Sequence, residues 1–126
     1  MNEDISQLIG KTLRAVTQHG REAIDFEAVS GERWQMSYEP DCCATCDIED
    51  IVGDLQDLVD SPIIMAEAST NSDDPPRPNE YMSVMSHTWT FYKFATAKGY
   101  VTVRWYGESN GYYSETASFR RIDVAA

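Results

Sequence analysis

The chain has 126 residues, a formal net charge of -11 and a hydrophobic fraction of 42%, with fourteen aromatic residues. This composition predicts one globular domain spanning residues 1–126 and excludes wholesale disorder. The acidic charge argues against non-specific nucleic-acid binding, which needs lysine and arginine to neutralise phosphates. No apolar run is long enough to span a membrane, and the N-terminus lacks the basic and apolar regions of a secretory signal, so we expect a cytoplasmic protein.

Three short runs of alternating apolar and polar residues occupy the first third of the chain. A dipeptide that ends in glycine follows each of the first two runs, which is typical of a tight turn between strands. Pro40 ends the series, because proline cannot donate a hydrogen bond to a central strand pair. We therefore expect an antiparallel meander with one buried face, made of residues 11–18, 23–29 and 33–38.

The middle of the chain is acidic, since residues 39–60 carry eight carboxylates and no basic side chain. We predict a strand from Asp47 to Val52. Asp54 is suited to cap a short helix that ends at Val59, because apolar residues follow Asp54 at helical spacing.

An apolar strand is expected next, over residues 62–68. Residues 69–83 are rich in Ser, Asn, Asp and Pro and show no apolar periodicity. They predict a solvated, mobile loop rather than a linker between domains.

The last third fixes the predicted architecture, because residues 86–114 hold nine of the fourteen aromatic residues. A short connection ending at Gly99 and the dipeptide Asn110-Gly111, a strong hairpin signal, separate three apolar runs. We expect these runs to form consecutive neighbouring strands over 87–96, 100–107 and 112–121. The predicted fold class is β-dominated α+β, a single domain with a mostly antiparallel sheet of about six or seven strands and one short helix.

Three cysteines lie close together, and Cys43 to Cys46 forms a CxxC motif. Cysteine thiolates bind zinc, but one CxxC without a second is a weak signal. The alternative is that these small thiols pack as apolar groups, and the surrounding carboxylates disfavour a nucleophilic thiolate. We expect reduced cysteines, no metal and no cofactor. The weak metal candidates are Cys42, Cys43, Cys46 and His87, with His19 or Asp41 as further ligands.

The acidic segment could supply oxygen ligands for calcium or magnesium. Its spacing does not match an EF-hand loop, so a solvated acidic face with a helix cap is the simpler interpretation. The chain also contains no phosphate-binding glycine loop, no GxSxG and no HExxH motif, which argues against an enzyme.

A polar and aromatic cluster at the predicted second hairpin is the strongest candidate for a binding site. Arg104 and Tyr106 are two residues apart on a strand and therefore share a face. A guanidinium flanked by tyrosines suits an anion, a nucleotide or an interface hot spot. Alternatively, Arg104 pairs with an acid of the 39–60 segment and the tyrosines cover the core. The candidate binding residues are Arg104, Tyr106, Glu108, Ser109, Asn110, Tyr112 and Tyr113.

The chain resembles a family of small bacteriophage and prophage proteins that is catalogued as a domain of unknown function. The matching stretches are LIGKTL, DCC with DIEDIVGDLQDLVDSPIIMAEA, and TWTFYKFATAKGYVTVRWYGESNGYYSE. Together they run from Leu8 to Phe119. The resemblance implies expression inside a bacterial host and imports no activity. The family pattern includes the Cys42-Cys43 pair but no cysteine at position 46, which argues against a three-cysteine zinc site.

We expect a non-enzymatic phage or prophage accessory protein that binds and modulates a host protein, such as a defence or transcription component. The alternative is a protein that binds a nucleotide or another small anion through the Arg104 cluster. A concave pocket around Arg104 would favour the anion, whereas a flat acidic or aromatic patch would favour the protein partner. Neither a membrane nor direct nucleic-acid contact is expected, and the sequence is compatible with a homo-oligomer.

Overall fold

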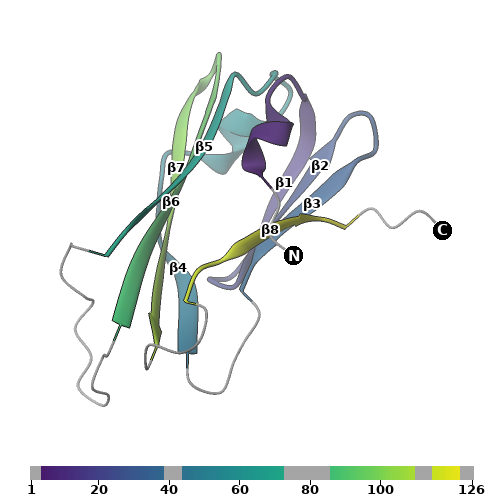
Figure 1. Cartoon of the computed structure of the whole chain (residues 1–126). Helices are drawn as coiled ribbons and strands as arrows, with labels where there is room; N and C mark the ends of the chain where they lie inside the picture. The colour runs from purple at the N-terminus through teal and green to yellow at the C-terminus, as the bar shows by residue number, and fades with distance from the viewer. Residues whose placement is uncertain (1–3, 39–43, 73–85, 110–114, 123–126) are drawn as a thin grey trace.

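Two four-stranded antiparallel sheets face each other across a hydrophobic core in the computed structural model of the chain (Figure 1). The structure describes residues 4–38, 44–72, 86–109 and 115–122. The first sheet has the order β1-β2-β3-β8, with β1 Leu13–His19, β2 Ala23–Ala28, β3 Arg33–Ser37 and β8 Ser118–Arg121. The second sheet has the order β4-β7-β6-β5, with β4 Ala44–Val52, β7 Gly99–Ser109, β6 Ser86–Thr96 and β5 Met65–Asn71. Two short 3-10 helices, η1 Ile5–Leu8 and η2 Leu55–Leu58, lie between the sheets near one end (Figure 1).

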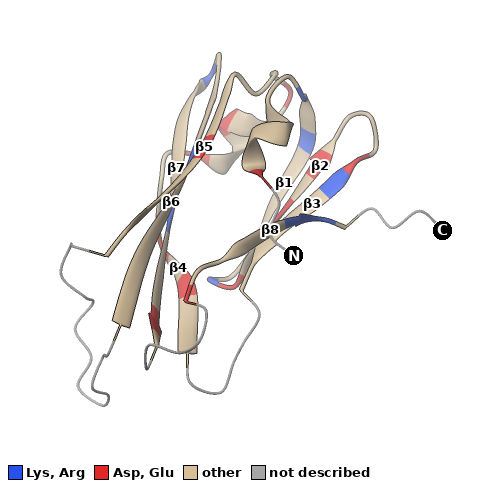
Figure 2. Ribbon diagram, viewed as in Figure 1, with Lys and Arg blue, Asp and Glu red and all other residues tan. Residues whose placement is uncertain are grey.

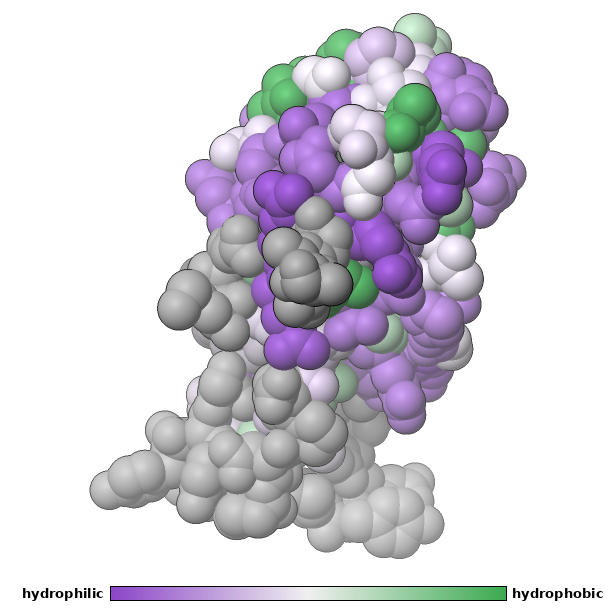
Figure 3. Space-filling view, turned by 90° about the vertical axis from the view of Figure 1, so that its right-hand side faces the viewer, coloured by the Kyte–Doolittle hydropathy of each residue, from purple (hydrophilic) through white to green (hydrophobic). Residues whose placement is uncertain are grey.

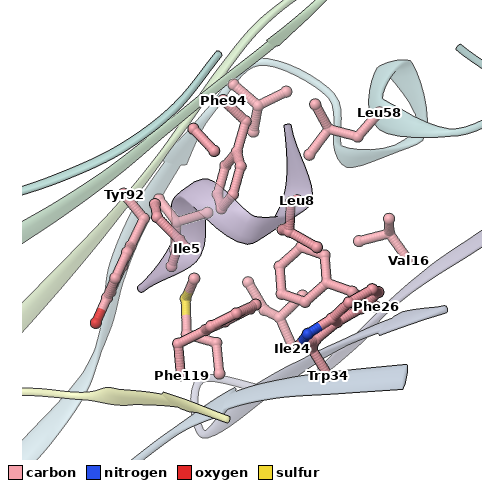
Figure 4. Packing of buried hydrophobic residues seen from close by; sticks show 14 of the residues in the cluster. Ile5, Leu8, Val16, Ile24, Phe26, Trp34, Leu58, Tyr92, Phe94 and Phe119 are labelled. Carbon is pink, nitrogen blue, oxygen red and sulfur yellow. The ribbon is translucent and has the colours of Figure 1, made fainter. Parts of the chain in front are cut away.

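The core forms because alternate residues of each strand point toward the opposite sheet. The ring of Phe26 in β2 lies 5.7 Å from that of Phe94 in β6 and 5.9 Å from that of Phe119 in β8, measured between centroids. These three side chains are at most 1% exposed. Figure 4 shows Ile5 and Leu58 of the two 3-10 helices beside the same cluster. One apolar cluster therefore holds both sheets together.

The predicted fold class is confirmed in its coarse form, because the fold is β-dominated and antiparallel. The meander is confirmed as β1, β2 and β3, and the predicted short helix is the 3-10 helix η2, which Asp54 caps through a bond from the Gln56 N–H. The structure has eight strands rather than six or seven. No helix in the described part of the chain has the length and apolar character needed to cross a membrane.

The prediction that residues 112–121 pair with the preceding strand is wrong. Strands β6 and β7 are neighbours as expected, but the final strand, β8, pairs with β3 in the other sheet. Phe119 accounts for the difference, because its pairing with Met36 places both side chains in the core. A local turn signal carries no information about such a distant partner. The turn conformation at Asn110-Gly111 and most of residues 69–83 lie outside the described residues.

The two sheets also meet at the edge strand β4. A register shift interrupts the pairing of β4 with β7 between Ile48 and Asp50. At this point the Ile48 N–H donates to the backbone oxygen of Arg21 at 2.9 Å, and Nε of Arg21 donates to the Ile48 carbonyl at 2.9 Å. The guanidinium also approaches Asp47 and Glu49, at 3.5 and 3.4 Å. The β1–β2 turn, which contains Arg21, is thereby held against the second sheet.

Basic side chains gather on the first sheet, where Figure 2 shows them on β1, β3 and β8. Arg14 and Arg33 both approach Glu27, and Lys11 lies 2.8 Å from Glu32. The hydrogen bond from Lys11 lowers the pKa of Glu32 below its usual value. Carboxylates thus offset the positive charge of this sheet, which does not favour a phosphate-binding stripe.

A polar network covers part of the inner face of the second sheet. The Glu115 carboxylate accepts hydrogen bonds from the hydroxyls of Ser86 and Thr88 in β6, at 2.8 and 2.6 Å, and of Ser109 in β7, at 2.7 Å. Gly107 lies beneath this segment, because a Cβ atom there would stand 1.7 Å from the backbone oxygen of Glu115. The segment can approach the sheet only where β7 has no side chain.

We therefore expect Gly107→Ala to destabilise the protein strongly, because a backbone atom blocks the added methyl group and has little freedom to yield. The free energy of unfolding, measured by denaturant titration, should fall by about 3 kcal/mol or more. Gly20→Ala is the control: Gly20 has φ of 59° and open space around its Cβ position. That variant should lose only about 1–2 kcal/mol through backbone strain. Equal losses would contradict the close approach at Gly107.

Tyr92 provides a second test of the inner face. Its buried hydroxyl donates to the Ala117 carbonyl at 3.1 Å. Burial, with a smaller contribution from nearby Cys46, raises the pKa of Tyr92 from 10.0 to about 12. Because the folded state keeps this proton where the unfolded state loses it, stability from Tyr92 is fully present below pH 10 and declines as the pH rises toward 12.

Unfolding free energies measured between about pH 9 and 12 should therefore converge for the parent and Tyr92→Phe, which cannot ionise at this position. The parent should be the more stable protein at the lower end, because it keeps the bond to Ala117. Tyr100→Phe is the matched control, since Tyr100 is 75% exposed. A Tyr92→Phe curve that stays parallel to the parent curve would contradict the assigned pKa.

Candidate functional site

The residues with the strongest binding chemistry lie on the outer face of the second sheet. In β7, Val103 and Trp105 point into the core, so Arg104 and Tyr106 point outward. Strand β6 follows the same alternation, and its register places Phe91 beside Arg104, Trp89 beside Tyr106, and His87 beside Glu108. We call these six residues the outer cluster: His87, Trp89, Phe91, Arg104, Tyr106 and Glu108.

The outer cluster has a buried layer and an accessible layer. Tyr106 is fully buried and its hydroxyl donates to Oε2 of Glu108, which is 5% exposed, at 3.0 Å. The Trp89 ring packs on Tyr106 with 4.6 Å between centroids, and the His87 ring stacks on it at 6.2 Å. His87, Trp89 and Phe91 are partly exposed. Tyr106 therefore supports the accessible rings from beneath and does not itself face solvent.

Arg104 is held by an aromatic ring more than by an acid. Its Cζ atom lies 5.2 Å from the centroid of the Trp89 ring, within the range of a cation–π contact. Its Nη2 atom is 4.0 Å from Oδ2 of Asp50, and these two side chains are 39% and 54% exposed. The buried Nε atom of Arg104 has no hydrogen-bond partner among the described residues. Arg104 is thus a partly exposed donor on an aromatic platform rather than half of a buried ion pair.

The structure brings together only part of the predicted binding cluster. Arg104, Tyr106 and Glu108 share the outer face, but Ser109 is buried on the inner face and donates to Glu115. The remaining predicted members, Asn110, Tyr112 and Tyr113, lie outside the described residues.

Sequence reasoning missed Trp89 and Phe91 as members of this face. Their signal was present, because they occupy alternate positions of β6 just as Arg104 and Tyr106 do in β7. What the sequence lacked was the register that sets the two pairs side by side.

The metal candidates do not converge. Cys46 pairs with Gly107 and packs against the core, whereas His87 pairs with Glu108 on the outer face. Because the two side chains point to opposite faces of one sheet, they cannot bind the same ion. Cys42, Cys43 and Asp41 lie outside the described residues, and His19 instead contacts Asp25 at 2.9 Å. Within the described ranges, no three His, Cys, Asp or Glu residues are grouped so as to hold a metal.

The carboxylates of the acidic segment have structural partners instead. Asp47 and Glu49 approach Arg21, and Asp50 lies near Arg104. Asp54 accepts the backbone N–H of Gln56 at 2.9 Å and so caps η2. These contacts favour the solvated acidic face over a calcium or magnesium site.

The chain belongs to a family catalogued as a domain of unknown function, DUF7448, whose match covers residues 6–119. No curated protein matches the chain, and no solved structure does so either. The family assigns no reaction, ligand or partner, so function has to be argued from the geometry of the site.

The geometry of Arg104 predicts a small effect on stability. Because its pair with Asp50 is long and exposed, Arg104→Ala should lower the free energy of unfolding by about 1 kcal/mol or less. Arg21→Ala is the comparison variant, since it removes a bond that joins the two sheets, and it should cost more. Denaturant titrations measure both. A loss of about 3–5 kcal/mol for Arg104→Ala would instead indicate a buried structural pair.

Proposed function

We propose that this protein is a non-enzymatic accessory protein of phage or prophage origin that binds a host protein through the outer cluster. Its place of action is the bacterial cytoplasm, and its partner presents a basic surface. The observation that carries the proposal is the stack of Arg104 on Trp89 over a buried Tyr106–Glu108 support.

The residue types of the outer cluster support a protein interface, and so does the way its buried residues support the accessible ones. Tryptophan, tyrosine and arginine dominate the binding energy of measured interfaces, usually at a well-packed centre. Trp89 and Arg104 are partly exposed, and their side chains are already held by their contact with each other and by the packing of Trp89 on Tyr106. Little side-chain freedom remains to be lost when a partner covers them, so binding has a low entropic cost.

Charge favours a basic partner over a small anion. Asp47 and Asp50 lie on β4 next to the outer cluster, and the whole chain carries -11. The negative electrostatic potential that these charges create attracts a positively charged surface and repels phosphates or carboxylates. In addition, four cavities in the described part of the chain are lined by side chains other than Arg104.

The opposite side of the molecule has a different surface. Figure 3 shows the side of the first sheet, where hydrophilic residues predominate and hydrophobic ones are scattered. Arg14 there is an exposed arginine that already pairs with Glu27, so it offers a matched control for Arg104.

The proposal is tested by quantitative mass spectrometry of host proteins retained by the immobilised chain. The parent and Arg14→Ala should retain the same host protein, and Trp89→Ala and Arg104→Ala should retain at least about tenfold less of it. Retention should also weaken as salt is raised, because the attraction depends on charge.

Two results would contradict this function. Equal retention by all four proteins would show that the outer cluster is not the interface. A small anion that co-purifies with the parent but not with Arg104→Ala would favour the ligand-binding alternative.

A further inference from the structure

A row of four hydroxyl groups runs along the inner face of β6, on the opposite side of the sheet from the outer cluster. The row consists of Ser86, Thr88, Thr90 and Tyr92, which alternate along the strand. Three of the four have acceptors in the 115–117 segment. Ser86 and Thr88 donate to the Glu115 carboxylate, and Tyr92 donates to the Ala117 carbonyl.

Thr90 is the exception in this row. It is 4% exposed, and its Oγ1 atom is buried without a hydrogen-bond partner among the described residues. An unsatisfied buried hydroxyl is destabilising, and a valine of the same shape would avoid that cost. A bound molecule could supply the hydrogen-bond partner that the described residues do not provide.

Thr90 lies in the wall of a cleft of about 300 Å³ on the inner face of the second sheet. This volume is at the lower end of the range for small-molecule sites. The cleft is bordered by edge strand β5, by the start of η1 and by the residues that precede β8. Its polar lining consists of Asp4, Ser69, Thr70, Thr90 and Thr116.

The lining has a definite chemistry. The threonines at positions 70, 90 and 116 and the carboxylate of Asp4 line the cleft, whereas Ser69 pairs with the outward-facing Phe91 and borders the cleft through its backbone. No lysine or arginine among the described residues lines it. The backbone N–H of Ser6 donates to Asp4 and lowers its pKa, so this carboxylate is charged at neutral pH. The apolar lining includes Ile5 and the Tyr92 ring, which Figure 4 shows side by side, with the Tyr92 hydroxyl directed away from the apolar cluster.

We propose that this cleft binds a small alkylammonium ligand. The ammonium group has three donors and no acceptor, which suits the Asp4 carboxylate and the unsatisfied oxygen of Thr90. A short alkyl chain fits the apolar wall formed by Ile5 and Tyr92. An anion of the same size would meet the Asp4 charge and the -11 charge of the chain.

This site is independent of the proposed host-protein interface. The cleft lies on the inner face of β5 and β6, whereas Trp89 and Arg104 lie on the outer face of the second sheet. The two proposals can therefore fail separately.

The test is an NMR titration of the isotopically labelled full chain, in which amide chemical shifts report binding. The three probes are of matched size: butylammonium, butyrate and 1-butanol. Butylammonium should shift the amides of residues 68–70, 90–92 and 116–117. Butyrate should leave them unchanged, and 1-butanol should bind at least about tenfold more weakly than butylammonium.

Two conservative variants test which side chains recognise the ammonium group. Asp4→Asn keeps a side-chain acceptor for the cap of η1 but removes the charge, and it should weaken butylammonium binding about tenfold. Thr90→Val removes only the hydroxyl and should weaken binding several-fold. Thr102→Val, on the outer face of β7, is the matched control and should leave the affinity unchanged.

Thr90→Val also gives a result without any ligand. Because the hydroxyl has no partner among the described residues, the Tm of this variant should equal or exceed that of the parent. A lower Tm would overturn the proposal, since it would show that the hydroxyl is already satisfied. Equal shifts with butyrate and butylammonium, no shifts with either, or affinity unaffected by both Asp4→Asn and Thr90→Val would overturn it as well.

Discussion

The passage of the chain from the second sheet to the first depends on the packing of Glu115 against Gly107. The backbone can lie on β7 there because position 107 has no Cβ atom, and three hydroxyls satisfy the carboxylate that is placed on the inner face. A carboxylate in that position would be costly without such donors. From this fixed point the chain continues into β8, which pairs with β3 and brings Phe119 against Phe26. A polar contact thus determines where part of the apolar core is assembled.

Strands β6 and β7 present different sets of side chains on their two faces. Odd-numbered residues of β6 such as Trp89 and Phe91 face outward with Arg104, while the even-numbered Thr88 and Thr90 face the opposite sheet. A shift of one residue in the pairing would exchange the two sets. The core side chains prevent this shift, because Trp105 would then have to leave the interior. The register that keeps the core side chains buried also separates the outer cluster from the hydroxyl row.

Local patterns were sufficient to predict the meander and the β6–β7 hairpin, since alternation and glycine turns act between neighbours in sequence. They could not predict the partner of β8, because the contact of Phe119 with Met36 and Phe26 joins residues more than eighty positions apart. The site shows the same limit. Arg104 could be identified from its residue type, but the burial of Tyr106 and the separation of Cys46 from His87 depend on which strands lie side by side.

The hydrogen bonds between Arg21 and Ile48 have a consequence for self-association. An edge strand exposes unpaired backbone groups, which invite strand addition by other copies and, from there, fibril growth. At Ile48 the outward N–H and C=O of β4 are both occupied by Arg21, and the adjoining bulge distorts the strand. At Ile48 a second copy could pair with this edge only by displacing the β1–β2 turn. The contact that holds the two sheets together therefore also disfavours polymerisation through this edge.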